Sequence, residues 1–188
     1  MVPGMLVTYT TNRLTLNILN PSMAGLVLDF YVKNRFFLEP HEPERTKRFY
    51  TFEYQHSNLS CEYNAFIRHS YIRYWILLDN CPDRVIGTVC FSNMLKGAFA
   101  SCMIGYKLGK EYCGKGYMQE ALTKLIPIIC KELSIHRIEA MVMPGNIPSI
   151  NLLNRLHFIE EGYLHSFAKI NGAWEDHILY TYINPEPI

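Results

Sequence analysis

The segment EYCGKGYMQEA, residues 111–121, places two glycines directly before a stretch with helical character. Glycine costs roughly 1 kcal/mol relative to alanine inside a helix, so Gly114 and Gly116 indicate a place where bare backbone is needed. The first turn of a helix has unpaired N–H groups and the positive end of the helix dipole, and glycine lets a phosphate approach them closely. A plain turn also uses glycines. The segment therefore predicts either an anion-binding loop or a simple turn.

Two familiar phosphate-binding motifs do not fit the spacing of this segment. A P-loop has the pattern GxxxxGK followed by Ser or Thr, and Tyr117 stands in that place here. A dinucleotide-binding fingerprint needs a third glycine three residues after Gly116, where this sequence has Gln119. Both classes of nucleotide site are therefore excluded.

Length and composition describe an ordinary globular chain. The 188 residues predict a single domain spanning residues 1–188. Hydrophobic residues make up 49% of the chain, but no apolar stretch is long enough to cross a bilayer, so we expect no membrane association. Residues 1–16 lack a basic segment followed by an apolar run, which argues against a secretory signal. We therefore expect a cytoplasmic protein.

The cysteines and the charge balance limit the partners. The six cysteines form no CxxC pair, and no His/Cys cluster has zinc-ligand spacing, so we expect reduced thiols and no metal site. A net charge of +1 gives no broad basic surface, and we expect no direct DNA binding. The locally basic and aromatic stretch RTKRFY (45–50) predicts either a contact site or, more simply, a solvated helix face.

Apolar periodicity predicts a mixed α/β sheet in the order strand, two helices, three strands, helix, strand, helix, two strands. The strands are expected at residues 13–19, 71–78, 85–91, 100–108, 137–143, 158–164 and 177–183. The helices are expected at about 21–34, 44–68, 118–133 and 146–156. Pro127 lies inside the third of these helices, where we expect a kink or a loosened turn.

Several stretches along the chain are similar to one enzyme family. They are NRFFLEPHEP (34–43), FSNMLKGAF (91–99), IGYKL (104–108), GKGYMQEAL (114–122), HRIEAMVMPGN (136–146) and INGAWEDHILY (170–180). Together they resemble the RimJ/RimL branch of the GNAT acetyltransferases, the ribosomal-protein-alanine N-acetyltransferases, from Arg13 onward, and the RimJ type most closely. The acetyl-CoA loop of GNAT enzymes reads Arg or Gln, two residues, Gly, one residue, then Gly or Ala. This pattern falls on residues 113–118, where Gly116 matches it and Cys113 and Met118 depart from it.

The resemblance implies a GNAT fold of the α/β (α+β) class, with a mixed, mostly antiparallel sheet of about seven strands flanked by helices. It implies that the sheet splays between its fourth and fifth strands, IGYKL and RIEAMVM, and that the pantetheine arm of acetyl-CoA lies in the gap. The cofactor-binding residues that it implies are Tyr106, Lys107, Leu108, Cys113, Gly114, Lys115, Gly116, Tyr117, Met118, Asn146 and Ser149. Main-chain groups are expected to do most of the binding, and Lys115 either adds charge or faces solvent.

Asn146 and Ser149 form an NxxS pattern at a predicted helix start. From the residues alone, a helix cap followed by a polar first-turn residue explains them. The resemblance implies instead that Asn146 contacts the cofactor arm and that Ser149 lies near the sulfur. Many GNAT enzymes have a tyrosine general acid four residues after the serine position, where this sequence has Leu153. Ser149 is therefore the candidate to stabilise the leaving thiolate.

The base of the reaction is less constrained by the sequence. An α-amino group with a pKa of about 8 is partly neutral at neutral pH, so no strong base is required. Glu39, Glu42 and Asp176 are the candidates, directly or through water. A solvated or structural role explains each of them equally well.

Aromatic and histidine residues bear on the acceptor side. Phe36, Phe37 and Trp174 either line the acceptor groove or pack in the core. His41 stands where the branch commonly has tryptophan, so the groove is expected to differ from that of typical members. His157 stands where the family has a helix-ending glycine. It either lowers the free energy of unfolding by about 1 kcal/mol or changes the way the helix ends.

These expectations combine into one function. We expect an enzyme that moves the acetyl group of acetyl-CoA to the N-terminal amino group of a protein, a ribosomal protein beginning with alanine or serine, by direct attack in a ternary complex. Main-chain N–H groups near the IGYKL strand are expected to polarise the carbonyl. The alternatives are an acetyltransferase for a small amine such as a polyamine or an antibiotic, and a non-catalytic CoA-binding regulator or ribosome assembly factor. Either a monomer or a homodimer is compatible with the sequence.

Overall fold

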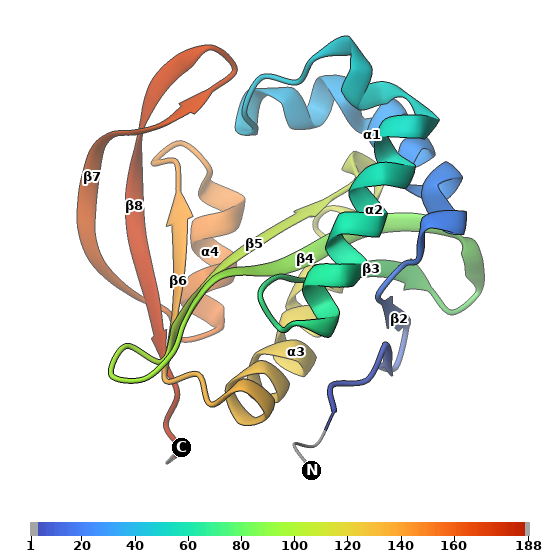
Figure 1. Cartoon of the computed structure of the whole chain (residues 1–188). Helices are drawn as coiled ribbons and strands as arrows, with labels where there is room; N and C mark the ends of the chain where they lie inside the picture. The colour runs from blue at the N-terminus through green and yellow to red at the C-terminus, as the bar shows by residue number, and fades with distance from the viewer. Residues whose placement is uncertain (1–3, 187–188) are drawn as a thin grey trace.

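The computed structural model describes residues 4–186, which form one mixed sheet flanked by helices (Figure 1). The strands are β1 (Thr8–Thr10), β2 (Leu14–Asn17), β3 (Ile72–Leu78), β4 (Cys81–Leu95), β5 (Ser101–Leu108), β6 (Arg137–Val142), β7 (Ile159–Ile170) and β8 (Ala173–Ile183). The α-helices are α1 (Ala24–Leu38), α2 (Phe52–Ile67), α3 (Tyr117–Leu133) and α4 (Ile147–Arg155). The sheet order is β1-β2-β3-β4-β5-β6-β8-β7, so β5 and β6 meet inside the sheet.

The sheet parts between β5 and β6. These two strands run parallel and pair only from Ser101 with Arg137 to Met103 with Glu139, whereas every other neighbouring pair is antiparallel. Beyond that point β5 continues to Leu108 without a partner on this side, and Figure 1 shows the two strands diverging. The predicted splay and the mostly antiparallel sheet are confirmed.

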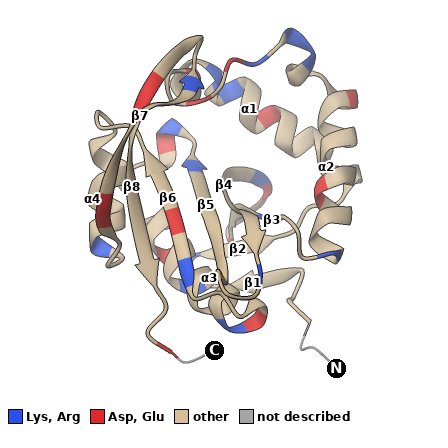
Figure 2. Cartoon of the chain, turned by 60° about the vertical axis from the view of Figure 1, so that its left-hand side comes forward, with Lys and Arg blue, Asp and Glu red and all other residues tan. Residues whose placement is uncertain are grey.

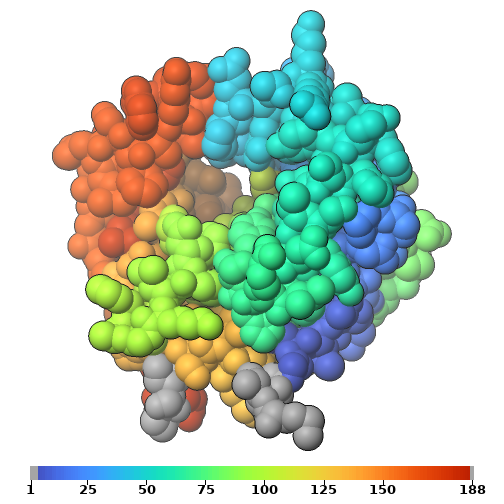
Figure 3. Space-filling view, in the orientation of Figure 1, coloured from blue at the N-terminus to red at the C-terminus, as the bar shows by residue number. Residues whose placement is uncertain are grey.

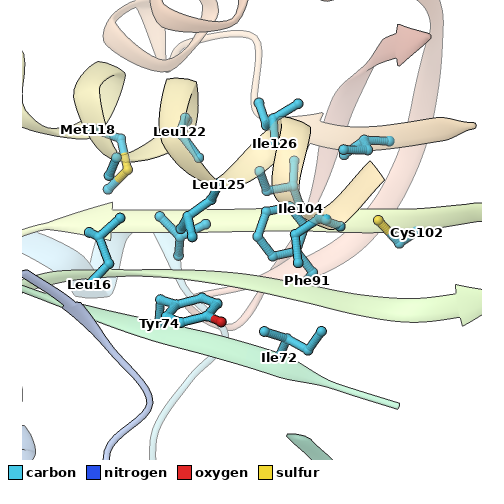
Figure 4. Close-up of a cluster of buried hydrophobic side chains, with 14 of the residues drawn as sticks. Leu16, Ile72, Tyr74, Phe91, Cys102, Ile104, Met118, Leu122, Leu125 and Ile126 are labelled. Carbon is cyan, nitrogen blue, oxygen red and sulfur yellow. The ribbon is translucent and has the colours of Figure 1, made fainter. Parts of the chain in front are cut away.

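Helices α3 and α4 cover one face of the sheet. The buried residues of α3 recur at helical spacing and lie over side chains from the first strands of the sheet (Figure 4). The labelled members of this cluster are Leu16, Ile72, Tyr74, Phe91, Cys102, Ile104, Met118, Leu122, Leu125 and Ile126. Leu122 is completely buried, and burial of one such side chain contributes about 1.5–3 kcal/mol. This packing fixes the start of α3 against the end of β5.

Helices α1 and α2 cover the opposite face. Their core centres on Trp75, which packs edge-on against Phe30 and Tyr31 of α1 with ring centroids 6.2 and 6.0 Å apart. Trp75 alternates along β3 with Tyr74, which belongs to the cluster under α3. A single strand therefore supplies both cores, as its continuous apolar sequence requires.

The N-terminal half departs from the sequence prediction in three places. Strand β1 lies outside the predicted set, and the described residues form eight strands instead of about seven. Helix α1 runs to Leu38 and not to residue 34. The helix predicted from residue 44 begins at Phe52, because Thr51 accepts a hydrogen bond from the Tyr54 N–H and caps it. Only a short 3-10 turn, Lys47–Tyr50, precedes that cap.

The strands of the C-terminal half are longer than predicted. Strand β4 continues to Leu95, and β7 and β8 extend toward each other to form one long hairpin. Its turn is Asn171-Gly172, with φ angles of +44° and +86°, which suit a tight two-residue connection. Residues 165–176 lack a clean apolar alternation because both faces of this hairpin end are largely exposed.

The structure also bears on three other expectations from the sequence. Helix α3 continues through Pro127 without interruption, so the proline does not end the helix. All six cysteines are free thiols, as expected. Within residues 4–186, no helix is both long enough and apolar enough to span a membrane.

His157 follows helix α4 in a left-handed conformation, with φ of +62°. Its N–H donates to the Asn154 carbonyl at 3.1 Å, so the residue closes the helix as a glycine would. The Cβ of histidine is unfavourable in this region, which is the first of the two outcomes expected from the sequence.

Replacing His157 with glycine is expected to raise the free energy of unfolding by about 1 kcal/mol, because glycine removes the Cβ strain. Urea unfolding monitored by circular dichroism measures the change. His157→Ala is the matched control, since it removes the same imidazole but keeps the Cβ, and it should give no such gain. Equal stability of the two variants would contradict the strain argument.

Candidate active site

The glycine loop, residues 113–116, lies between α3 and a short 3-10 turn, Lys110–Tyr112, that follows β5. Gly114 and Gly116 have φ angles of +74° and +80°, a region that residues with side chains rarely adopt. A Cβ on Gly114 would meet nothing within 4 Å, so the backbone conformation, not packing, requires glycine there. Gly116 is the N-cap of α3, and its carbonyl accepts the first helical hydrogen bond from the Glu120 N–H at 3.0 Å.

The start of α3 leaves a run of backbone donors free. Among residues 4–186, no carbonyl or side chain accepts a hydrogen bond from the N–H groups of residues 114–119. Such donors, together with the positive end of the helix dipole, suit an anion. Lys115 is exposed, and its ammonium lies 5.8 Å from the centre of the Tyr112 ring. The loop therefore has the chemistry of a phosphate cradle and fits a diphosphate group.

Strand β5 presents different side chains to its two faces just before this loop. Tyr106 lies on the α4 side, where it contacts Ser149. Lys107 points to the opposite side, where its ammonium pairs with Glu42 and lies 5.6 Å from the centre of the Tyr31 ring. The main chain of residues 104–108 pairs with β4 only, so its other edge is open along the splay.

Tyr106 and Ser149 form a hydroxyl pair at the mouth of the splay. The Tyr106 Oη lies 2.7 Å from the Ser149 Oγ. Burial raises the pKa of Tyr106 to about 12, although the hydrogen bond with Ser149 opposes that shift, so the phenol keeps its proton at neutral pH. The Ser149 N–H donates to the Asn146 side-chain oxygen at 3.3 Å, which makes Asn146 the cap of α4. The capping interpretation of Asn146 is thus what its contacts support, and the cap fixes Ser149.

Glu42 and Glu39 are both engaged in ion pairs. The Glu42 carboxylate pairs with Lys107 and lies 3.5 Å from an Arg45 nitrogen, and only 9% of the residue is exposed. Its carbonyl accepts a hydrogen bond from the Asn171 N–H at 3.0 Å, so Glu42 also holds the turn of the β7–β8 hairpin. Glu39 pairs with Arg35 at 2.6 Å. These contacts favour the structural interpretation that the sequence leaves open.

Asp176 lies on β8, and its carboxylate is bound by groups of the neighbouring strand. It accepts hydrogen bonds from the Ser166 N–H at 2.7 Å and from the Tyr163 hydroxyl at 3.0 Å, and His165 lies 3.7 Å away. The hydrogen bond from the Ser166 N–H, followed by that from Tyr163, lowers the pKa of Asp176. All three partners belong to β7, so these contacts do not bring Asp176 to the Ser149 pair.

Figure 3 shows a hollow bordered by the β7–β8 hairpin and by the segment between α1 and α2, two segments that also contact each other through the hydrogen bond from the Asn171 N–H to the Glu42 carbonyl. Phe36 is 86% exposed and Trp174 is 65% exposed, so core packing is wrong for these two side chains. Phe36, Phe37 and His41 line one pocket at the end of α1. Exposed aromatic side chains that line a pocket, as Phe36 and Phe37 do, are suited to hold an acceptor, and the acceptor role of Phe36, Phe37 and Trp174 stays a prediction.

The far wall of the splay is stiffened by charge pairs. Arg137 and Glu139, the blue and red segments of β6 in Figure 2, pair at 2.7 Å. Arg137 also pairs with Glu161 of β7 and donates to the Thr181 hydroxyl of β8 at 2.9 Å. The strands β6, β7 and β8 are therefore tied together, and this half of the sheet is expected to act as one rigid wall.

Two functional candidates were missed by the sequence prediction. The family resemblance implies a role for the main chain of Tyr106 only, although the alternation of β5 puts its phenol on the same face as Ile104. Arg13, next to the start of α3, gave no sequence signal, since its partner Glu120 lies 107 residues away. Only the folded chain brings these two residues together.

The comparison with known proteins agrees with this geometry. Residues 13–159 match the family model described as an acetyltransferase (GNAT) domain. The chain belongs to the GNAT acetyltransferase family, and it is an enzyme of the acyltransferase class.

Among curated relatives, the [ribosomal protein uS5]-alanine N-acetyltransferase of Escherichia coli is 37% identical over 96% of this chain and 92% of its own length. Among solved structures, the ribosomal-protein-S5-alanine acetyltransferase of Vibrio fischeri superimposes with a TM-score of 0.91 and 32% identity, over 96% of this chain and 98% of that one. RimJ of Mycobacterium smegmatis, solved in complex with CoA-disulfide, has a TM-score of 0.85 and 27% identity, over 92% and 84% of the two chains.

Replacing Gly116 with alanine is expected to weaken CoA binding about tenfold or more. The Cβ is unfavourable at φ of +80°, so the loop would shift and its N–H groups would lose their alignment. Calorimetric titration of the variant with CoA measures the loss. Gly25→Ala is the matched control, because Gly25 lies in α1 with nothing within 4 Å of an added Cβ. Unchanged affinity in Gly116→Ala would contradict the assignment of the cradle.

Proposed function

We propose that this enzyme transfers the acetyl group of acetyl-CoA to the α-amino group of a ribosomal protein that begins with alanine or serine, in the cytoplasm. The single observation that carries the proposal is that the open edge of β5 is followed, after Gly109 and one 3-10 turn, by the free amides of the glycine loop. The E. coli and V. fischeri relatives, which cover nearly all of this chain, are named as a ribosomal protein uS5-alanine N-acetyltransferase and a ribosomal-protein-S5-alanine acetyltransferase.

In this proposal the cofactor follows the splay from the loop to Ser149. The N–H groups at the start of α3 bind the diphosphate, and the unpaired main chain of residues 106–108 meets the amides of the pantetheine arm. Asn146 positions Ser149 through its cap. No described group of three His, Cys, Asp or Glu residues could hold a metal ion, and none is needed for this reaction.

Tyr106 and Ser149 stabilise the leaving group. As the neutral amine nitrogen bonds to the carbonyl carbon, the C–S bond breaks, and the proton that the nitrogen loses passes through water to the thiolate, so that CoA leaves as the thiol. Either hydroxyl of the Tyr106–Ser149 pair can donate. In this proposal the phenol donates to the Ser149 oxygen, so the Ser149 hydroxyl is free to donate a hydrogen bond to the sulfur. Ser149 thus stabilises the thiolate, and Tyr106 positions Ser149.

The amine reaches the reaction without a dedicated side-chain base. Glu42 is paired with Lys107, and Asp176 accepts hydrogen bonds from groups of β7, so both carboxylates are engaged by other residues of this chain. We therefore assign both residues to positioning: Glu42 joins the α1–α2 segment to β5 and to the hairpin turn, and Asp176 shapes the hairpin. A fraction of α-amino groups is neutral near pH 7 and suffices as nucleophile.

A panel of acceptors tests the proposed substrate. Purified enzyme and acetyl-CoA are incubated separately with peptides beginning with alanine or serine, with an Nα-blocked peptide containing lysine, with spermidine and with an aminoglycoside, and mass spectrometry locates the acetyl group. We expect acetylation of the free α-amino groups only. Acetylation of spermidine or the aminoglycoside alone would replace the proposal by a small-amine acetyltransferase. Binding of CoA with no product in any arm would identify a regulator.

Replacing Ser149 with alanine is expected to lower kcat about 10²-fold, and Tyr106→Phe about tenfold, with little change in the KM for acetyl-CoA. The double variant should be no slower than Ser149→Ala, because Tyr106 acts through Ser149. Steady-state kinetics on an alanine peptide measures these values, with Tyr63→Phe on α2 as the matched control. A double variant in which the two losses of kcat add would contradict the view that Tyr106 acts through Ser149.

The pH dependence distinguishes this scheme from one with a tyrosine base. The amine reacts in its neutral form, so kcat/KM should rise with pH through about 8 and then level off. The Tyr106 pKa of about 12 lies above this range, so Tyr106→Phe should leave the midpoint unchanged while lowering the plateau. A shift of the midpoint in this variant would contradict the positioning role.

A further inference from the structure

A cluster of polar contacts joins the turn before β2 to the first turn of α3. The Glu120 carboxylate accepts hydrogen bonds from the Thr11 hydroxyl at 2.6 Å, the Arg13 N–H at 3.0 Å and the Arg13 Nε at 2.7 Å. Burial alone would raise the pKa of Glu120, but the hydrogen bonds from Thr11 and Arg13 outweigh it and lower the pKa below the ordinary value. The carboxylate is thus ionised and fixed to residues far away in the sequence.

Arg13 uses this anchor to reach the glycine loop. Its Nη1 donates to the Lys115 carbonyl at 3.1 Å, and its guanidinium lies 4.6 Å from the centre of the Tyr117 ring. Its Nη2 would lie 3.4 Å from a Cβ placed on Gly116. One guanidinium therefore contacts the residues immediately before and after Gly116 and lies beside Gly116 itself.

Stability does not explain so many contacts at one exposed arginine. The Arg13 side chain is 48% exposed, and ion pairs at such sites contribute at most about 1 kcal/mol. The contacts are instead directed at the backbone on both sides of a residue in the left-handed region, where the loop needs an external support. Among the described residues no hydrogen bond uses Nη2, so this donor beside the free amides is available to a further acceptor.

We propose that Arg13 is a cofactor-positioning residue: anchored by Glu120, it holds the glycine loop in its diphosphate-binding conformation and adds a positive charge beside the diphosphate. The proposal rests on the proposed function for the identity of the ligand. It does not depend on the acceptor, because binding of CoA is measured without any acceptor present. It also explains why Cys113 can replace the basic or amide residue usual at the start of the loop: Arg13 supplies that charge from another element.

The test compares a ligand that contains the diphosphate with one that lacks it. The variants are Arg13→Gln, Arg13→Lys and Glu120→Gln, with Arg68→Gln as the matched control, since Arg68 is an exposed arginine after α2, away from the loop. CoA affinity is measured by calorimetry, and kcat/KM is measured with acetyl-CoA and with acetyl-pantetheine as alternative donors. Thermal unfolding of each variant without ligand verifies folding.

Arg13→Gln should weaken CoA binding about tenfold, the loss usual for a hydrogen bond to a charged group, and leave kcat/KM for acetyl-pantetheine within about twofold of wild type. Glu120→Gln should show a smaller loss in the same direction, because the guanidinium stays but its anchor weakens. Arg13→Lys should recover only part of the affinity, since lysine keeps the charge and loses the fork.

Two results would overturn the proposal. Equal losses with both donors would mean that Arg13 supports the whole fold or the reaction centre, not the diphosphate site. Unchanged CoA affinity in a folded Arg13→Gln variant would mean that the loop keeps its conformation unaided. If wild type binds CoA and Arg13→Gln loses affinity while no peptide is acetylated, the proposed function fails and the role of Arg13 stands.

Discussion

The parting of β5 from β6 is the constraint on which the rest of the site depends. Three paired positions hold the strands together at one end, and beyond Met103 the edge of β5 has no partner. Unpaired backbone groups inside a sheet are costly unless something else binds them. A ligand with its own amides can complete that edge as a short additional strand would. The opening therefore leaves backbone groups of β5 without hydrogen bonds in the fold, and these same groups are available to bind a ligand.

The glycine loop, which follows the same strand in the chain, also leaves backbone groups unpaired. Its two left-handed residues bring the chain round so that α3 starts at the open edge, with its free N–H groups beside the splay. The buried stripe of α3 packs against β2, β3, β4 and β5, which prevents the helix start from moving. The glycine loop is thus positioned by the hydrophobic core; its conformation requires the two glycines, and Arg13 donates to its Lys115 carbonyl.

Sequence reasoning succeeds where the signal is local. The alternation in β5, the stripe of α3 and the glycines between them are each visible within a few turns or strand residues, so they predict the strand, the helix and a loop of bare backbone; the splay is implied by the family resemblance alone. Sequence reasoning fails where the partners of a contact lie far apart in the chain. The ion pairs of Arg13 with Glu120 and of Glu42 with Lys107 leave no recognisable pattern in the sequence, because only folding brings their residues together. The exposed hairpin end around Asn171 fails for another reason, because a ribbon with two solvated faces shows no apolar period.

The two faces of β5 explain how a site with few ionisable groups can still be ordered. Tyr106 faces α4 and holds Ser149, while its neighbour Lys107 faces the other way and holds Glu42. Strand alternation forces these adjacent residues to opposite sides. Any shift of β5 would therefore disturb both the Tyr106–Ser149 hydroxyl pair and the Lys107–Glu42 ion pair. The Glu42 carbonyl also accepts a hydrogen bond from the Asn171 N–H, so the position of Glu42 restrains the hairpin turn as well. In the proposed reaction, one strand therefore aligns the leaving-group side with the acceptor side, and that reaction needs alignment more than it needs a strong acid or base.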